Sequence, residues 1–143
     1  MMISTKGRYA LRVMIDLAEH NSDGYLPLKD IARRQNISEK YLESIIQVLS
    51  RENFLVGLRG KGGGYKLTRE AQTYTVGSIL KLTEGSLAPV ACLECKPNQC
   101  ERAAICKTLP MWRKLDEIIT NYFESITIAD LANPDLNGND FVI

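Results

Sequence analysis

The chain has 143 residues, a length that suits one domain or one domain with a small accessory segment. Its composition, 45% hydrophobic and 24% charged, is typical of a globular protein and excludes a disordered or collagen-like chain. No apolar run approaches the roughly 18 residues that a membrane span needs, and the first residues lack the apolar segment of a secretion signal. We therefore expect a cytoplasmic protein that does not enter a membrane.

Charge is unevenly distributed, although the net charge is only +1. Residues 1–70 carry twelve Lys or Arg against eight Asp or Glu, whereas residues 71–143 carry six against nine. The basic first half indicates an anionic partner. The single histidine, His20, excludes a histidine-rich metal site, and neither a nucleophile–base triad nor a phosphate-binding loop is apparent. We expect no enzymatic activity.

Three helices are predicted in the first third of the chain. Apolar residues at helical spacing predict the first from Thr5 to about His20, with Ser4 or Thr5 as its cap. Pro27 opens a second helix over residues 28–35, and Ser38 caps a third over residues 39–51.

The short junction Asn36-Ile37-Ser38 joins the second and third of these helices. Asn suits the left-handed residue that ends a helix, and a junction this short predicts a helix-turn-helix. From this segment alone, the alternative is an ordinary pair of antiparallel helices in a helical bundle.

A β-hairpin follows. Residues 54–58 and 65–68 are strand-like, and the six residues between them, Arg59 to Gly64, include four glycines that supply the positive φ of a tight tip. A helix-turn-helix followed by a basic, glycine-tipped hairpin predicts a winged helix, whose chemistry is DNA binding.

The predicted DNA contacts fall into three groups. The start of the recognition helix would present side chains to base edges and phosphates, the hairpin tip would enter a minor groove through Arg59, and other basic residues would contact phosphates. The recognition-helix residues are Ser38, Lys40, Tyr41 and Ser44, the hairpin residues are Arg59 and Lys61, and the further basic residues are Lys6, Arg8, Arg33 and Arg34.

The second half of the chain begins with a predicted helix that Thr75 caps and that ends near Gly85. A longer helix is predicted over residues 110–125, with a stripe formed by Trp112, Leu115, Ile119, Tyr122, Phe123 and Ile126. So large an aromatic stripe favours a dimerisation helix over a helix that only packs within its own chain. Residues 133–143 are predicted to be a flexible tail.

All four cysteines, Cys92, Cys95, Cys100 and Cys106, lie in one polar loop between the two helices. In a reducing compartment, such clustering favours metal binding or redox chemistry over structural disulfides. Thiolates are ligands for iron–sulfur clusters and for zinc, and a thiol switch is a third possibility. A Cys-x-x-Cys oxidoreductase is disfavoured because the βαβ context of that motif is absent.

Together these residues resemble the bacterial winged-helix regulators that include IscR, NsrR and CymR, and most of all the IscR type. The likeness covers almost the whole chain, and it is carried by four motifs: Ser4-Thr5-Lys6-Gly7-Arg8-Tyr9-Ala10, Ile37-Ser38 with Tyr41-Leu42-Glu43, Arg59-Gly60-Lys61-Gly62-Gly63-Gly64-Tyr65, and Ile126-Thr127-Ile128-Ala129-Asp130-Leu131.

The resemblance implies a mainly α-helical fold with a small hairpin wing. Residues 1–84 would form a winged helix-turn-helix domain, residues 85–108 a cysteine-rich cofactor-binding loop, and residues 109–132 a dimerisation helix and the short segment after it. It further implies a homodimer on a partly palindromic operator, with control, through repression, of genes for iron–sulfur cluster biogenesis or sulfur metabolism.

The resemblance also implies a cofactor. The three cluster cysteines of the family map onto Cys92, Cys100 and Cys106, and Cys95 is additional. The fourth ligand of some relatives, a histidine or an aspartate, corresponds to Leu109 or Arg8 here, so Cys95 is our first choice, ahead of Glu94, Glu101, an external thiol or water. We expect a [2Fe-2S] cluster, with [4Fe-4S], zinc, and a thiol or nitric-oxide switch as alternatives.

Overall fold

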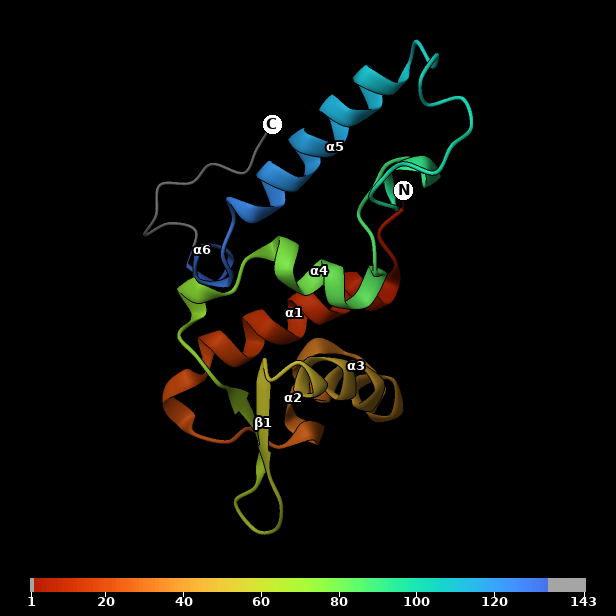
Figure 1. Cartoon of the computed structure of the whole chain (residues 1–143). Helices are drawn as coiled ribbons and strands as arrows, with labels where there is room; N and C mark the ends of the chain where they lie inside the picture. Colours follow the sequence, from red (N-terminus) through yellow and green to blue (C-terminus); the bar gives the residue numbers. More distant parts are fainter. Residues whose placement is uncertain (1, 134–143) are drawn as a thin grey trace.

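The computed structural model describes residues 2–133, which form a mainly helical body with one antiparallel hairpin (Figure 1). The α-helices are α1 (Thr5–Glu19), α2 (Leu28–Gln35), α3 (Glu39–Arg51), α4 (Val76–Glu84), α5 (Leu109–Glu124) and α6 (Ile128–Ala132). The strands are β1 (Leu55–Leu58) and β2 (Gly64–Leu67), and three short 3-10 turns are η1 (Asn21–Asp23), η2 (Ala71–Thr73) and η3 (Ala91–Leu93).

Helix α1 lies at the centre of the main core. Ala10, Val13, Met14 and Leu17 on this helix are fully or almost fully buried, and residues of α2, α3, the hairpin, α4 and α6 complete the same cluster. A polar residue also lies in this core. Asp16, at 1% exposure, accepts hydrogen bonds from the Arg34 guanidinium at 2.7 and 3.0 Å. This ion pair joins α1 to α2.

Helices α2 and α3 form the predicted helix-turn-helix. Asn36 ends α2 in the left-handed conformation, with φ 54° and ψ 50°. Ile37 is buried, and the Ser38 hydroxyl accepts a hydrogen bond from the Tyr41 amide as the cap of α3. The buried face of α3 consists of Leu42, Ile45, Ile46 and Leu49, which leaves its opposite face open.

The hairpin is anchored to the body at its base. The backbones of Leu26 and Tyr65 exchange hydrogen bonds of 2.9 and 2.8 Å, so the segment before α2 borders β2. Gly64, at φ 149°, approaches the Leu26 backbone so closely that a Cβ would collide with its carbonyl. The buried Tyr74 hydroxyl donates to the Phe54 carbonyl at 2.9 Å and accepts from the amides of Thr68 and Arg69. These bonds fix the angle at which the hairpin leaves the domain.

The second half of the chain contains a short helix besides the two that the sequence predicts there. Helix α6, which the sequence analysis did not predict, is capped by Thr127 and Asp130 in a reciprocal capping box and packs on α1. Helix α5 leaves the body as an arm, and the cysteine loop lies at its far end, away from the hairpin (Figure 1). Within residues 2–133, no helix is long and apolar enough to cross a membrane. Residues 134–143 of the predicted tail lie outside the described range.

Candidate nucleic-acid interface and cysteine loop

The outer face of α3 presents polar side chains. Ser38 and Lys40 are exposed at its start, as predicted. Tyr41 and Ser44 are half-buried, because the Tyr41 ring packs edge-on against Tyr9 of α1 at 5.9 Å and the Ser44 hydroxyl donates to the Tyr41 carbonyl at 2.7 Å. The exposed face of α3 thus includes Ser38 and Lys40 in full and Tyr41 and Ser44 only in part.

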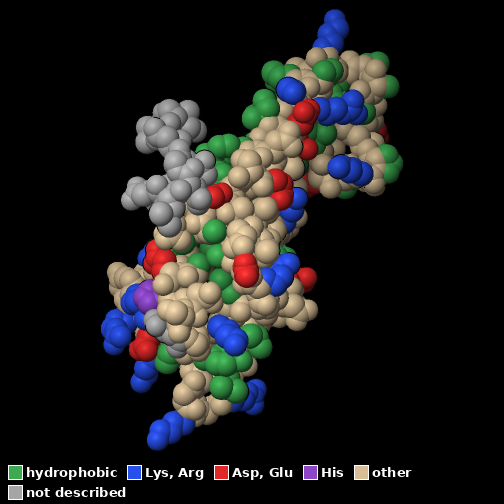
Figure 2. Space-filling model, turned by 90° about the vertical axis from the view of Figure 1, so that its left-hand side faces the viewer, with side chains coloured by type: hydrophobic (Ala, Val, Ile, Leu, Met, Phe, Trp, Pro, Cys, Tyr) green, Lys and Arg blue, Asp and Glu red, His purple; other side chains and the backbone are tan. Residues whose placement is uncertain are grey.

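The hairpin tip carries the two predicted basic residues. Arg59 and Lys61 are exposed, and each lies next to a glycine with positive φ, Gly60 at 92° and Gly62 at 78°. Lys and Arg side chains project from this end of the molecule (Figure 2). The tight turn therefore holds positive charge away from the body.

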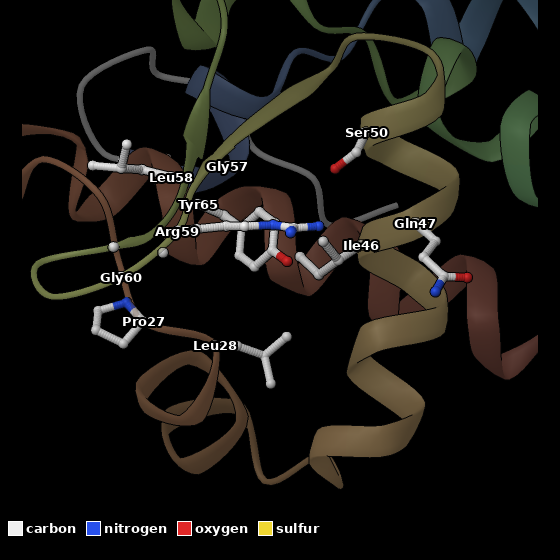
Figure 3. A pocket seen from close by; sticks show the side chains of 12 residues that line it. Pro27, Leu28, Ile46, Gln47, Ser50, Gly57, Leu58, Arg59, Gly60 and Tyr65 are labelled. Atoms are coloured by element: carbon white, nitrogen blue, oxygen red, sulfur yellow. The ribbon is translucent and has the colours of Figure 1, made fainter.

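A groove of about 530 Å³ separates the hairpin from α3 (Figure 3). Ile46, Gln47 and Ser50 of α3 line one wall, and Leu58 and Arg59 lie on the hairpin side. Gln47 is exposed on the face of α3 that borders this groove, and the sequence analysis missed it. Gln47 lies seven residues after Lys40 and three after Ser44, and this helical spacing, which places it on the same face of α3, is the signal that could have identified it.

The start of α1 adds further positive charge. Lys6 is half-buried and Arg8 is exposed, with its guanidinium donating to the Thr5 hydroxyl at 3.0 Å. The Tyr9–Tyr41 contact brings this first part of α1 next to the first turn of α3. Arg33 is exposed, whereas the Arg34 guanidinium is directed to Asp16. The structure thus gives Arg34 a structural partner where the sequence analysis expected a phosphate contact.

An apolar stripe lies on the outer face of α5. Met111, Leu115, Ile118 and Tyr122 are 37–53% exposed, and their spacing of four, three and four residues places them on one side of the helix. The stripe predicted from the sequence was wrong in part, because Phe123 and Ile126 instead pack inward with Val76, Leu80 and Leu87. The aromatic residues of α5 therefore lie on two different faces of the helix, one exposed and one packed against the body.

The cysteine loop is polar and has little regular structure between Gly85 and Thr108 apart from η3. All four thiols are free; Cys95 and Cys100 are exposed, and Cys92 and Cys106 are half-buried. Soft thiolate donors of this kind suit an iron–sulfur cluster or zinc. Among the described residues, no three His, Cys, Asp or Glu side chains converge closely enough to hold a metal. The donor set fits such a group in kind, while this conformation of the loop keeps the donors apart.

Cys106 is chemically distinct within the loop. The Thr108 hydroxyl lies 3.4 Å from its sulfur, and this hydrogen bond, with the Thr108 and Leu109 amides and the charge of Arg102, lowers the pKa of the thiol. Cys106 also lies just before the first turn of α5, where the helix dipole favours a negative charge. The structure thus stabilises the thiolate form of Cys106.

Comparison with known proteins identifies the family. The Rrf2 family profile, described as an iron-dependent transcriptional regulator, matches residues 3–134. HTH-type transcriptional regulator IscR of Yersinia enterocolitica is 37% identical over 133 residues, which span 93% of this chain and 80% of that protein. IscR of Serratia proteamaculans is 36% identical over the same share of both chains. These relatives are transcriptional regulators, not enzymes.

Solved structures agree with this assignment. CymR of B. subtilis, the global cysteine regulator, matches 98% of this chain and 99% of its own with a TM-score of 0.77 and 36% identity. IscR of T. potens matches 98% of this chain and 92% of its own, with a TM-score of 0.76 and 35% identity. The predicted winged-helix fold and its family resemblance are confirmed: this chain belongs to the Rrf2 family of winged-helix transcriptional regulators and is similar to IscR over nearly its whole length.

Proposed function

We propose that this protein is a sequence-specific, DNA-binding repressor whose operator affinity is set by an iron–sulfur cluster in the cysteine loop. The observation that carries the proposal is one groove between the hairpin, whose exposed tip is basic, and the exposed polar face of α3, which includes Lys40 near its start and Gln47 beside the groove. With α3 in a major groove and the hairpin in the adjacent minor groove, the intervening DNA strand would pass over that groove.

The contacts divide by chemistry. Lys40 and Gln47 carry hydrogen-bonding groups on the open face of α3, so they are suited to base edges, and Ser38 lies where the helix begins. Arg59 would enter a narrow minor groove, where negative potential is concentrated. Lys6, Arg8, Lys61 and the Tyr41 hydroxyl would contact phosphates and thereby fix the register. The Ser44 hydroxyl would join them by turning its proton from the Tyr41 carbonyl to a phosphate oxygen.

The protein would act as a homodimer on a partly palindromic operator. The exposed stripe of α5 offers an apolar seam with the spacing of a two-helix contact. Two copies joined along α5 would present two recognition helices to successive half-sites. A cytoplasmic location, predicted from the sequence, accords with this role.

Cys92, Cys100 and Cys106 would hold the cluster, with Cys95 as the fourth ligand, and a [2Fe-2S] group is the first choice over [4Fe-4S]. Such a group supplies a site that oxidation or loss of iron alters. Gathering the four thiols requires the loop to change from its present conformation, and the loop joins α4 directly to α5. Cluster-dependent change in the loop would therefore alter the placement of the recognition helices. The iron–sulfur biogenesis or sulfur-metabolism genes are the expected targets.

A second candidate function is a regulator whose cysteines bind zinc or respond directly to thiol oxidation or nitric oxide. The exposed thiols of Cys95 and Cys100 and the lowered pKa of Cys106 favour it.

Anaerobic purification followed by iron, sulfide and zinc analysis, visible absorbance and selection of DNA from a random duplex library tests the proposal. We expect a coloured protein with iron and sulfide in equal amounts that enriches one partly palindromic sequence. A colourless protein with stoichiometric zinc would overturn the cluster, and a library without enrichment would overturn sequence-specific binding.

A further inference from the structure

Two helices of the winged domain begin with the same arrangement: a capping hydroxyl, a glycine in the first turn, and a glutamate from the end of another helix. The first case is at α4. Glu124, the last residue of α5, lies against Gly77, where an added Cβ would collide with the carboxylate. The Thr75 hydroxyl, which caps α4 by accepting from the Ser78 amide, donates to Glu124 Oε2 at 2.8 Å. Lys81 Nζ donates to Glu124 Oε1 at 3.2 Å.

The second case is at α1. Glu84, the last residue of α4, lies against Gly7, where an added Cβ would again collide with the carboxylate. The Ser4 hydroxyl caps α1 by accepting from the Gly7 amide at 3.0 Å and donates to Glu84 Oε1 at 2.6 Å. The Ser4 amide donates to the same oxygen at 3.0 Å. Carboxylates at helix N-termini are stabilised by the helix dipole and by charge-assisted hydrogen bonds.

Backbone hydrogen bonds reinforce the first contact. The Val76 amide donates to the Ile126 carbonyl at 2.8 Å, and the Ile128 amide donates to the Tyr74 carbonyl at 2.9 Å. The end of α5 is thus joined to the start of α4 by both backbone and side chains.

The two contacts are connected in series through α4. Glu124 links α5 to the start of α4, and Glu84 links the end of α4 to the start of α1, which carries Lys6 and Arg8. The cysteine loop begins directly after Glu84. A displacement of α5 or of the loop therefore acts on both ends of α4, and α4 acts on α1.

We propose that Glu124 and Glu84 are positioning residues that transmit the placement of α5 and the cysteine loop, through α4, to the DNA-binding face. This inference rests on the proposed function, because it concerns how a signal in the loop reaches DNA. Gly77 and Gly7 leave room for the two carboxylates, because an added Cβ at either position would displace the end of the facing glutamate side chain. We call these four residues the glutamate clasp.

The test compares Glu124→Ala with Glu117→Ala, a change on the same helix that removes only an exposed ion pair with Lys114. Two readouts are used: amide hydrogen exchange in cluster-free protein, and the ratio of affinities for the selected duplex with and without the iron–sulfur cluster. We expect Glu124→Ala to raise exchange at the amides of Ser78 and Gly7. It should also reduce the affinity ratio from roughly tenfold to about twofold. Glu117→Ala should change neither readout.

A double-mutant cycle tests the pairing itself. In the wild-type background, Gly77→Ala displaces the carboxylate and should reproduce the effect of Glu124→Ala. In the Glu124→Ala background, no carboxylate remains to be displaced, so Gly77→Ala should cause no further change. Additive effects of the two substitutions would overturn the proposed contact.

The two readouts separate this inference from the proposed function. If the wild-type protein binds the duplex equally with and without the cluster, the proposed signalling function is wrong. In that case the hydrogen-exchange data alone decide whether Glu124 couples α5 to the starts of α4 and α1. If the wild-type ratio is large, and Glu124→Ala retains that ratio with unchanged exchange at Gly7, the inference is wrong while the proposed function stands.

Discussion

The carboxylate of Asp16 shows how one buried charge secures the helix-turn-helix. Arg34 and Gln35 donate hydrogen bonds to it, and His20 lies nearby. Burial by itself raises the pKa of this carboxyl, but the hydrogen bonds of Arg34 and Gln35 and the charges of Arg34 and His20 outweigh burial, so the pKa is lowered overall. The ion pair therefore stabilises the fold above about pH 4, and its contribution is lost as the pH falls through the folded-state pKa.

Asp16→Asn should accordingly destabilise the protein by about 3 kcal/mol at pH 7, because it removes the buried negative charge that faces the Arg34 guanidinium. The loss should shrink as the pH falls below about 4, because the carboxylate of the unfolded chain is protonated first and the folded carboxylate follows only at its lowered pKa. Urea unfolding at pH 7 and pH 3 measures both. Asp30→Asn, which affects only the exposed pair with Arg33, is the control and should cost less than about 1 kcal/mol. An equal, pH-independent loss in the two variants would contradict this interpretation.

Arg59 and Lys6 should differ in what they contribute to DNA binding. Arg59→Ala should lower affinity for the selected duplex by about 1–3 kcal/mol and relax the sequence preference. Lys6→Ala should weaken binding to all duplexes alike and reduce the slope of log affinity against log salt by about one. Titrations of the selected duplex and a scrambled duplex at several salt concentrations measure both effects. Equal losses on the two duplexes for Arg59→Ala would show that the hairpin has no readout role.

Individual residues were predictable where their role is local. Asn36 and Ser38 were identified from the sequence because a left-handed residue and a helix cap depend on their immediate neighbours. Arg34 was assigned to phosphate because its partner, Asp16, lies 18 positions away and only the folded chain brings them together. Glu124 and Gly77 escaped notice for the same reason.

At the scale of elements, a substitution on α5 tests whether its apolar stripe forms the dimer interface. Ile118 is 53% exposed at the centre of its apolar stripe. Ile118→Glu would place a charge in the seam between two copies, so we expect a monomer with strongly weakened operator binding and an unchanged helical circular dichroism spectrum. Light scattering coupled to gel filtration measures the mass. Arg113→Glu, at an exposed position on the opposite side of α5, is the control and should remain a dimer. A dimeric Ile118→Glu protein would exclude this face as the interface.

The ends of α1 to α5 were predicted to within about two residues because caps and glycines mark them in the sequence. Helix α6 is only five residues long and was missed, since it depends on packing against α1 as much as on its own capping box. The division of the α5 aromatic residues between two faces was likewise hidden, because periodicity alone does not show which neighbour each face meets. The candidate DNA face was largely predictable, whereas the arrangement of the cysteines was not.

At the scale of the whole molecule, the hairpin and the cysteine loop lie at opposite ends, with α5 and α4 between them (Figure 1). The proposed signal at the cysteines would therefore have to pass through the body of the protein before it could change DNA binding. The connection of α5 to α4 and of α4 to α1 provides a continuous path of hydrogen bonds for this purpose. In the proposed dimer each copy would contribute one recognition helix, so a small change in the angle of α5 would alter both half-site contacts together.

Sedimentation of the protein with its selected duplex, under anaerobic conditions and at low salt, tests this account most directly. Two chains bound per duplex are predicted, with free protein sedimenting as a dimer and binding that weakens steeply as salt is added. A protein that sediments as a single chain, and that leaves the duplex unbound even at the lowest salt, would contradict it.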